Sequence, residues 1–138
     1  MTETRLPTPE QIDVLVAFLP KLYAEGFEPV KQWHGGEKRS DGVITMPYPE
    51  YDLVVIDFYR AVAAERWLDY GYHPEEAAQM IQSEETIKTS DLAQIKTMLT
   101  YCVRGERFCD GHWEEMIVQG HIRRLLERLI VLRAQMTG

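Results

Sequence analysis

One ten-residue stretch, Arg104–Trp113, holds the densest group of chemically capable side chains in the sequence. It combines two guanidinium groups, two carboxylates, a thiol, an imidazole and an indole, with two glycines among them. Such a set suits either a binding site or a joint that fixes two helices. The candidate ligand-binding residues are Arg104, Glu106, Arg107, Cys109, Asp110, His112 and Trp113.

The charged residues of this stretch allow two interpretations. Arginines beside the start of a helix suit a phosphate or carboxylate ligand, because unpaired backbone N–H groups and the helix dipole both favour an anion there. Glu106 and Asp110 would neutralise much of that field. The alternative is an internal cluster of ion pairs that fixes one helix end against its neighbour. The sequence favours the ion-pair cluster.

Cys109 is the candidate nucleophile, because Arg107, His112 and a nearby helix start would each lower the pKa of its thiol. Cys109 and His112, three positions apart across the start of a helix, do not obviously face each other. We therefore interpret Cys109 as a structural cysteine and predict no catalytic residue. The sequence leaves open whether the protein is an enzyme.

Zinc is the metal that this part of the chain would suit, because two thiols and two imidazoles are an acceptable ligand set. The four candidate ligands are Cys102, Cys109, His112 and His121. Their spacing, C-x6-C-x2-H-x8-H, matches no usual zinc-finger pattern, and Cys102 falls on an apolar helical stripe. A disulfide is disfavoured, because seven residues of helix span about 10.5 Å. We keep zinc binding as an alternative and assign no metal ligand.

Other function classes are disfavoured by pattern and charge. The sequence has no glycine-rich nucleotide loop and no G-x-S-x-G nucleophile motif, so we expect no cofactor. A net charge of −7 disfavours nucleic acid and anionic membranes as partners. His121–Gly138 is the exception: four arginines and one glutamate give it +3, which leaves −10 for residues 1–120. That basic segment is expected to lie against the acidic body of its own fold or of a second copy; the alternative is a basic surface for another partner.

The elements that position these residues read as helices. A chain of 138 residues, 45% of them hydrophobic, fits a single domain covering 1–138 with one core. Thr8, Pro9 and Gln11 predict a capped first helix, which Pro20 breaks and Gly26 ends. Apolar spacing and capping residues predict further helices over 51–68, 73–83, 90–103, 110–119 and 122–136, with Thr89 or Ser90 capping the fourth and Asp110 the fifth.

Residues 27–46 break the helical pattern and predict a small irregular insertion or β-hairpin in a mainly α fold. Ser40-Asp41-Gly42 supplies the turn, and Val43–Met46 the apolar second strand. Met46–Tyr51 follows as a rigid extended lead-in, because a residue before proline avoids the helical region.

Arg104–Trp113 is expected to form the junction between two of these helices. Gly105 and Gly111 bracket the chain reversal, and Phe108 and Trp113 anchor it in the core. The last helix carries a wide apolar stripe, which indicates a surface for self-association.

Two motifs, Met46–Tyr51 and Arg104–Trp113, resemble those of a family of small bacterial proteins of unknown function. The similarity covers nearly the whole chain, including Trp67–Tyr72 and the closing helix rich in arginine and leucine. The resemblance implies a single cytoplasmic domain and carries over no activity, cofactor or catalytic residue.

The sequence therefore predicts a non-catalytic binding or interaction module that associates with itself or with another protein. The alternatives are a small enzyme or anion-binding protein with its site at Arg104–Trp113, and a zinc protein. The first residues lack an apolar signal region, and two cysteines fit a reducing cytoplasm. No run reaches the roughly 18 apolar residues that a membrane helix needs.

Overall fold

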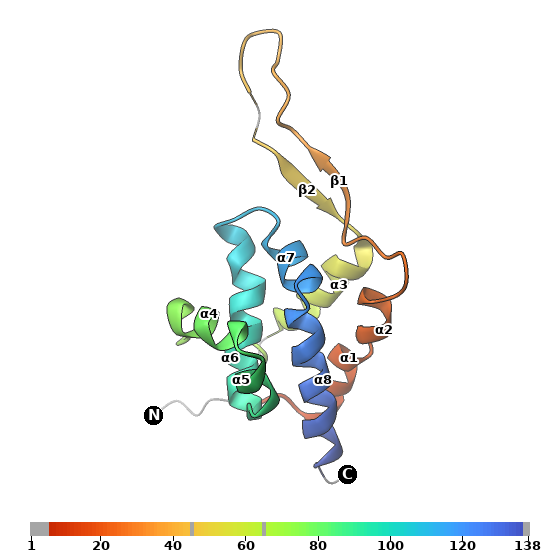
Figure 1. Cartoon of the computed structure of the whole chain (residues 1–138), viewed down its shortest axis with the longest axis vertical. Coiled ribbons are helices and arrows are strands. Elements are labelled where there is room, and N and C mark those ends of the chain that lie inside the picture. Colours follow the sequence, from red (N-terminus) through yellow and green to blue (C-terminus); the bar gives the residue numbers. More distant parts are fainter. Residues whose placement is uncertain (1–5, 45, 65, 137–138) are drawn as a thin grey trace.

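The computed structural model describes residues 6–44, 46–64 and 66–136, which form a helical body with one projecting hairpin (Figure 1). Thr45 and Glu65, which fall in the predicted second strand and in the predicted helix over 51–68, lie outside these residues, as do the first five and the last two residues. The elements are α1 (Pro9–Val16), α2 (Leu19–Leu22), β1 (Val30–His34), β2 (Tyr48–Tyr51), α3 (Leu53–Val62), α4 (Pro74–Gln82), α5 (Glu84–Lys88), α6 (Leu92–Arg104), the 3-10 turn η1 (Gly105–Arg107), α7 (His112–Val118) and α8 (His121–Ala134).

The predicted start of α1 is confirmed. The Thr8 hydroxyl accepts from the Gln11 N–H at 3.3 Å, and the Gln11 side chain accepts from the Thr8 N–H at 2.8 Å. The break at Pro20 is also confirmed, because α1 ends at Val16 and Pro20 lies in the first turn of α2. Gly26 lies in a turn beyond α2, so the helical segment ends earlier than predicted.

The predicted helix over 51–68 is too long at both ends. Asp52 caps α3, its carboxylate accepting from the Val54 N–H at 2.9 Å, and Tyr51 belongs to β2. The helix stops at Val62, and the chain then turns back to bury Trp67. Its role is as predicted, because Val55, Phe58, Tyr59 and Val62 are all core residues.

The boundaries of the next helices differ by small shifts. Asp91, one residue after the predicted Ser90, caps α6 by accepting from the Gln94 N–H at 2.8 Å. Ser90 is instead buried, and its hydroxyl donates to the Thr86 carbonyl at 2.6 Å. Helix α5 was not predicted, because a five-residue helix is too short to show apolar periodicity. Gly111, and not Asp110, caps α7.

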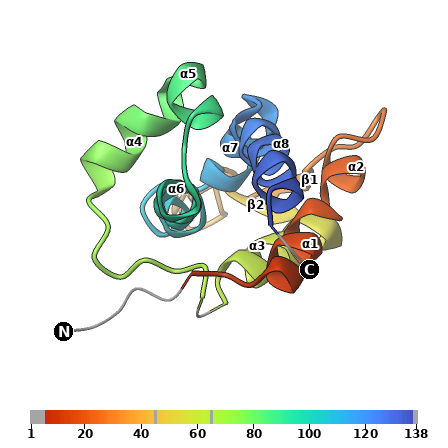
Figure 2. The ribbon, with the colours of Figure 1, turned by 90° about the horizontal axis from the view of Figure 1, so that it is seen from below.

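Helix α8 lies between the two halves of the body, with α1, α2 and α3 on one side and α4 and α5 on the other (Figure 2). Its apolar stripe is buried inside the fold at Ile122, Leu125, Leu126 and Leu129. The stripe is therefore mainly an internal contact and not the free surface expected from the sequence. Arg133 pairs with Asp13 of α1 at 3.0 Å, so this basic helix does lie against acidic residues of its own body.

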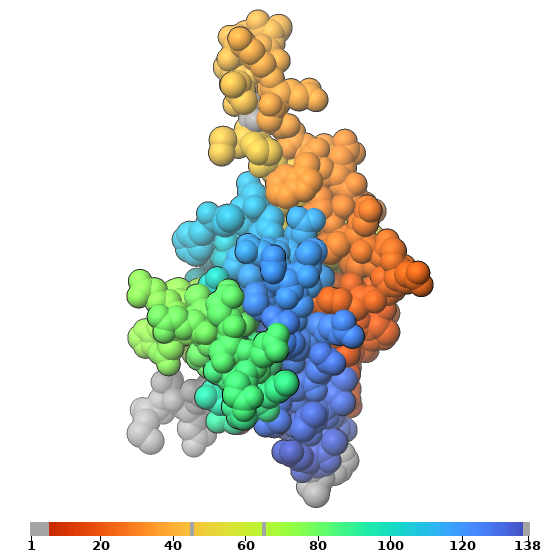
Figure 3. Space-filling view, viewed as in Figure 1, coloured from red at the N-terminus to blue at the C-terminus, as the bar shows by residue number. Residues whose placement is uncertain are grey.

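The hairpin is confirmed, but its second strand lies further along the chain than predicted. Strands β1 and β2 pair antiparallel, with Trp33 opposite Pro49 and His34 opposite Tyr48. Among the described residues of the region predicted as the second strand, Ile44 forms an isolated bridge with Lys38. The prolines that indicated a lead-in are compatible with an edge strand, because the Pro49 ring needs no N–H partner there. We call residues 30–51 the arm; it extends well beyond the helices (Figures 1 and 3).

Candidate functional site

The Glu106 carboxylate is the centre of the Arg104–Trp113 segment. Its Oε1 atom accepts from the Tyr51 hydroxyl and from the Trp113 N–H, both at 2.8 Å, and its Oε2 atom accepts from the Gly111 N–H at 3.0 Å. The two N–H groups belong to the start of α7, where a carboxylate is favoured by the helix dipole. One side chain thus caps α7 and ties it to the base of the arm.

Trp113 anchors the segment in the core, as predicted. Its ring stacks on Tyr59, with centroids 4.5 Å apart, and also lies against Tyr51 at 5.2 Å. The indole N–H donates to the Val103 carbonyl at 3.0 Å, and the Tyr59 hydroxyl donates to the Trp113 carbonyl at 3.2 Å. The polar atoms of this aromatic cluster are therefore engaged within the fold.

His112 packs tightly against the end of α6. A Cβ atom at Gly105 would overlap the His112 ring, so glycine is required there by close approach. The ring meets Tyr101 edge-on with centroids 5.1 Å apart, and Nε2 has no hydrogen-bond partner. Burial lowers the pKa of His112, which keeps the imidazole neutral near pH 7.

The rest of the segment faces outward. Arg107, Phe108, Cys109 and Asp110 are all exposed, and Phe108 shows 84% of its surface. The prediction that Phe108 anchors the joint is wrong, because the turn after η1 is closed by backbone bonds from Phe108 and Cys109 to the Gly105 carbonyl. No buried aromatic contact is needed to close it.

The predicted ion-pair cluster is also wrong. Among the described residues, no ion pair joins any two of Arg104, Glu106, Arg107 and Asp110. The Arg104 guanidinium instead lies 5.8 Å from the centre of the Tyr72 ring. The joint is held by hydrogen bonds from neutral donors to Glu106, which charge counting in the sequence does not reveal.

The four candidate zinc ligands do not come together. Cys102 is fully buried on the core side of α6, and burial raises the pKa of its thiol, whereas Cys109 is exposed. Within the described parts of the chain, no group of three or more His, Cys, Asp and Glu side chains is arranged to hold a metal. Both cysteines are free thiols, as expected from their spacing.

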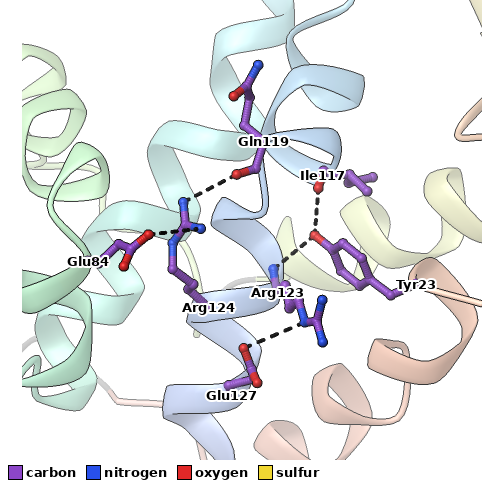
Figure 4. Close-up of polar contacts among 7 residues, drawn as sticks. All are labelled: Tyr23, Glu84, Ile117, Gln119, Arg123, Arg124 and Glu127. Atoms are coloured by element: carbon purple, nitrogen blue, oxygen red, sulfur yellow. Dashed lines mark hydrogen bonds and ion pairs between the residues drawn. The ribbon is translucent and has the colours of Figure 1, made fainter.

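A second polar cluster, which the sequence did not indicate, fixes the junction of α7 and α8 (Figure 4). The Tyr23 hydroxyl donates to the Ile117 carbonyl at 2.8 Å and accepts from the Arg123 N–H at 3.0 Å. Burial raises the pKa of Tyr23 to about 12. The Arg124 guanidinium donates to the Gln119 carbonyl at 3.3 Å and lies 3.8 Å from Glu84.

An open cleft of about 430 Å³ lies where the arm meets the body. Its walls are the 27–33 segment, including Val30 and Trp33, and the Glu114 and Val118 side chains of α7. The Trp33 ring reaches the α6–α7 loop, since a Cβ atom at Gly111 would lie 3.0 Å from it. The arm and the loop therefore form one continuous surface.

Across the described ranges, no helix combines the length and the apolar character required to cross a bilayer.

Comparisons with known proteins place the chain in a family. No curated protein and no solved structure matched the sequence. The family model described as "Family of unknown function (DUF6508)" matches residues 7–135, which is nearly the whole chain. The chain therefore belongs to the DUF6508 family.

Proposed function

We propose that this protein is a non-catalytic interaction module that binds a second copy of itself through the arm and the neighbouring loop. We call this surface, residues 30–51 together with 107–110, the arm face. The observation that carries the proposal is the set of apolar side chains that the arm face leaves in solvent. These are Trp33, Val43, Ile44, Met46, Tyr48 and Phe108.

The arm gains little stability from its own contacts. An isolated two-stranded hairpin is marginal in water, and both of its outer edges carry unpaired backbone groups. Met46 is 81% exposed and Ile44 is 65% exposed. Exposed apolar groups that project together on one element are typical of a protein-binding surface.

Charge supports a second copy as the partner. The arm carries three basic residues, Lys31, Lys38 and Arg39, and three acidic residues, Glu37, Asp41 and Glu50. It is thus neutral on a protein of net charge −7, so two arms can approach without the repulsion that acts between the bodies.

The candidate site residues then fall into two groups. Arg107, Phe108, Cys109 and Asp110 supply the exposed part of the arm face. Glu106, His112 and Trp113 hold the loop that presents them, through the contacts to the arm base and the core. In this proposal, the ligand that this segment binds is therefore another protein chain.

The two free thiols support a cytoplasmic location within this proposal, because exposed thiols such as Cys109 persist in a reducing compartment. Cell fractionation in the presence of a thiol-alkylating reagent, which preserves the redox state of the cysteines, checks this location.

Light scattering across a concentration series tests the proposed self-association. We expect the wild type to have the mass of a dimer at micromolar concentration. The variant with Ile44→Lys and Met46→Lys should have the mass of a monomer and an unchanged circular dichroism spectrum. Val14→Lys is the matched control, because Val14 is an exposed apolar residue on α1, away from the arm.

A wild-type protein that stays monomeric at every concentration would contradict self-association. A dimer that survives the arm substitutions but not Val14→Lys would place the contact on the helical body.

A further inference from the structure

Helix α7 is held at both ends by the same dipeptide. Gly111 precedes α7 and His112 is its first residue; Gly120 and His121 hold the same two places at the start of α8, immediately after α7. Both glycines have left-handed backbone angles, φ +93° and +83°, which other residues adopt only with strain. We call Gly111 and Gly120 the two hinges, because α7 joins its neighbours through them. Both histidines are 6% exposed. A buried imidazole therefore sits directly after each hinge.

His112 is buried against Gly105 at the end of α6. It hydrogen-bonds to the backbone of Tyr101, and its Nε2 atom faces Gly105 with no partner. A proton added at Nε2 would gain no acceptor in this contact. The carboxylates that face it are Glu106 and Glu115, and Glu106 is already engaged by Tyr51 and two N–H groups.

Burial also lowers the pKa of His121, and Arg124 lowers it further. The His121 Nδ1 atom lies 2.9 Å from an Arg124 Nη atom, so the imidazole must accept and the guanidinium must donate. A protonated His121 would lose this bond and place two cations in contact. The other groups that face it are the Ile81 backbone, Glu115 and His112, and it stands at the positive end of the α8 dipole.

We propose that α7 is an acid-released cap: protonation of His112 and His121 opens both glycine hinges and detaches α7 from α6 and α8. Helix α7 has only seven residues, so its conformation depends on its surroundings: the two histidines, the Glu106 carboxylate at its start and the Tyr23 hydroxyl near its end. The packing of α8 on α1, and of α3 on α1 and α6, does not pass through α7. The release therefore exposes Tyr59, on which the Trp113 ring of α7 stacks, while the rest of the core stays folded. This switch stands independently of self-association.

Amide hydrogen exchange read by NMR, from pH 7.5 to pH 5, tests the switch in the full-length protein. After correction for the intrinsic exchange rate, the 112–118 amides should lose protection as the pH falls. The loss should be about tenfold for each unit by which the histidine pKa differs between the docked and released states. Amides of α3 and of the α8 segment after His121 should stay protected.

Variants separate the two hinges from general acid effects. His112→Gln with His121→Gln keeps both sites neutral and should keep α7 protected at pH 5. His73→Gln is the control, because His73 is exposed at the start of α4, and it should leave the response unchanged. Constant α7 protection in the wild type would overturn the proposal, as would equal loss in all helices.

The wild-type comparison of α7 with α3 and α8 decides the question even if the double variant does not fold. The His121→Gln variant alone should retain the response at His112, with a smaller loss of protection.

Discussion

At the scale of single residues, Glu106 is the most consequential side chain of the segment that the sequence singled out. It accepts three hydrogen bonds, from donors at positions 51, 111 and 113. Removal of an acceptor leaves buried donors without a partner, which costs more free energy than the bond itself contributes. Its role is that of a tie between the arm and α7, and the exposed residues beside it are free to contact a partner.

Glu106→Ala should therefore lower the free energy of unfolding by about 3 kcal/mol, because three donors lose a charged acceptor. Chemical denaturation followed by circular dichroism measures this loss. Asp110→Ala, an exposed carboxylate in the same loop, is the matched control and should stay within about 0.5 kcal/mol of the wild type. Equal losses for the two variants would exclude a special role for Glu106.

At the scale of elements, the α6–α7 joint depends on a glycine that has no unusual backbone angle. Gly105 has φ −63°, so any residue fits its backbone, yet the His112 ring lies where a Cβ atom would be. The two helices approach at this point more closely than any side chain allows.

Gly105→Ala should lower the free energy of unfolding by about 2 kcal/mol, since the buried His112 ring must move to admit the methyl group. Gly71→Ala is the comparison, because the nearest atom to its added Cβ, at 3.7 Å, belongs to the Asp69 side chain. Gly71→Ala should leave the free energy of unfolding nearly unchanged. Thermal or urea unfolding of the two variants measures the difference. A Gly105→Ala variant with the wild-type free energy of unfolding would show that the His112 ring can move aside without loss of stability.

The elements were predicted well where the physical signal was local. Thr8, Pro9 and Gln11 specify the start of α1 through contacts within one turn, and the apolar stripe of α6 matches its buried face. The joint was predicted poorly, because its bonds join residues up to 55 positions apart. Phe108 counts as apolar in any pattern, but only the path of the chain decides that it is exposed.

At the scale of the whole molecule, the neutral histidines couple folding to pH. Burial lowers the pKa of His112, and burial together with Arg124 lowers the pKa of His121. The unfolded chain binds protons at both positions near its ordinary pKa of about 6.5, whereas the folded chain does so only at lower pH. The two neutral histidines therefore make their full contribution to the free energy of unfolding above about pH 6.5, and this contribution falls as the pH drops further.

Urea denaturation at a series of pH values should give a constant free energy of unfolding between pH 7 and 8. It should fall as the pH drops below about 6.5, because the unfolded state then binds more protons than the folded state. Replacement of both histidines by glutamine should flatten this part of the curve. Stability that rises on acidification from pH 7 to 5.5 would contradict the assignment of two neutral histidines.

The bond between Tyr51 and Glu106 also has an evolutionary consequence. Tyr51 is 8% exposed; its hydroxyl donates to this carboxylate, 2.8 Å away, and has a further hydrogen bond with the Glu114 backbone. A lineage that loses the acid would keep a phenol with no acceptor, a state that substitution by phenylalanine relieves. Homologues should therefore carry Tyr with Glu or Phe with a neutral residue at these two positions, and the mixed pairs should be rare.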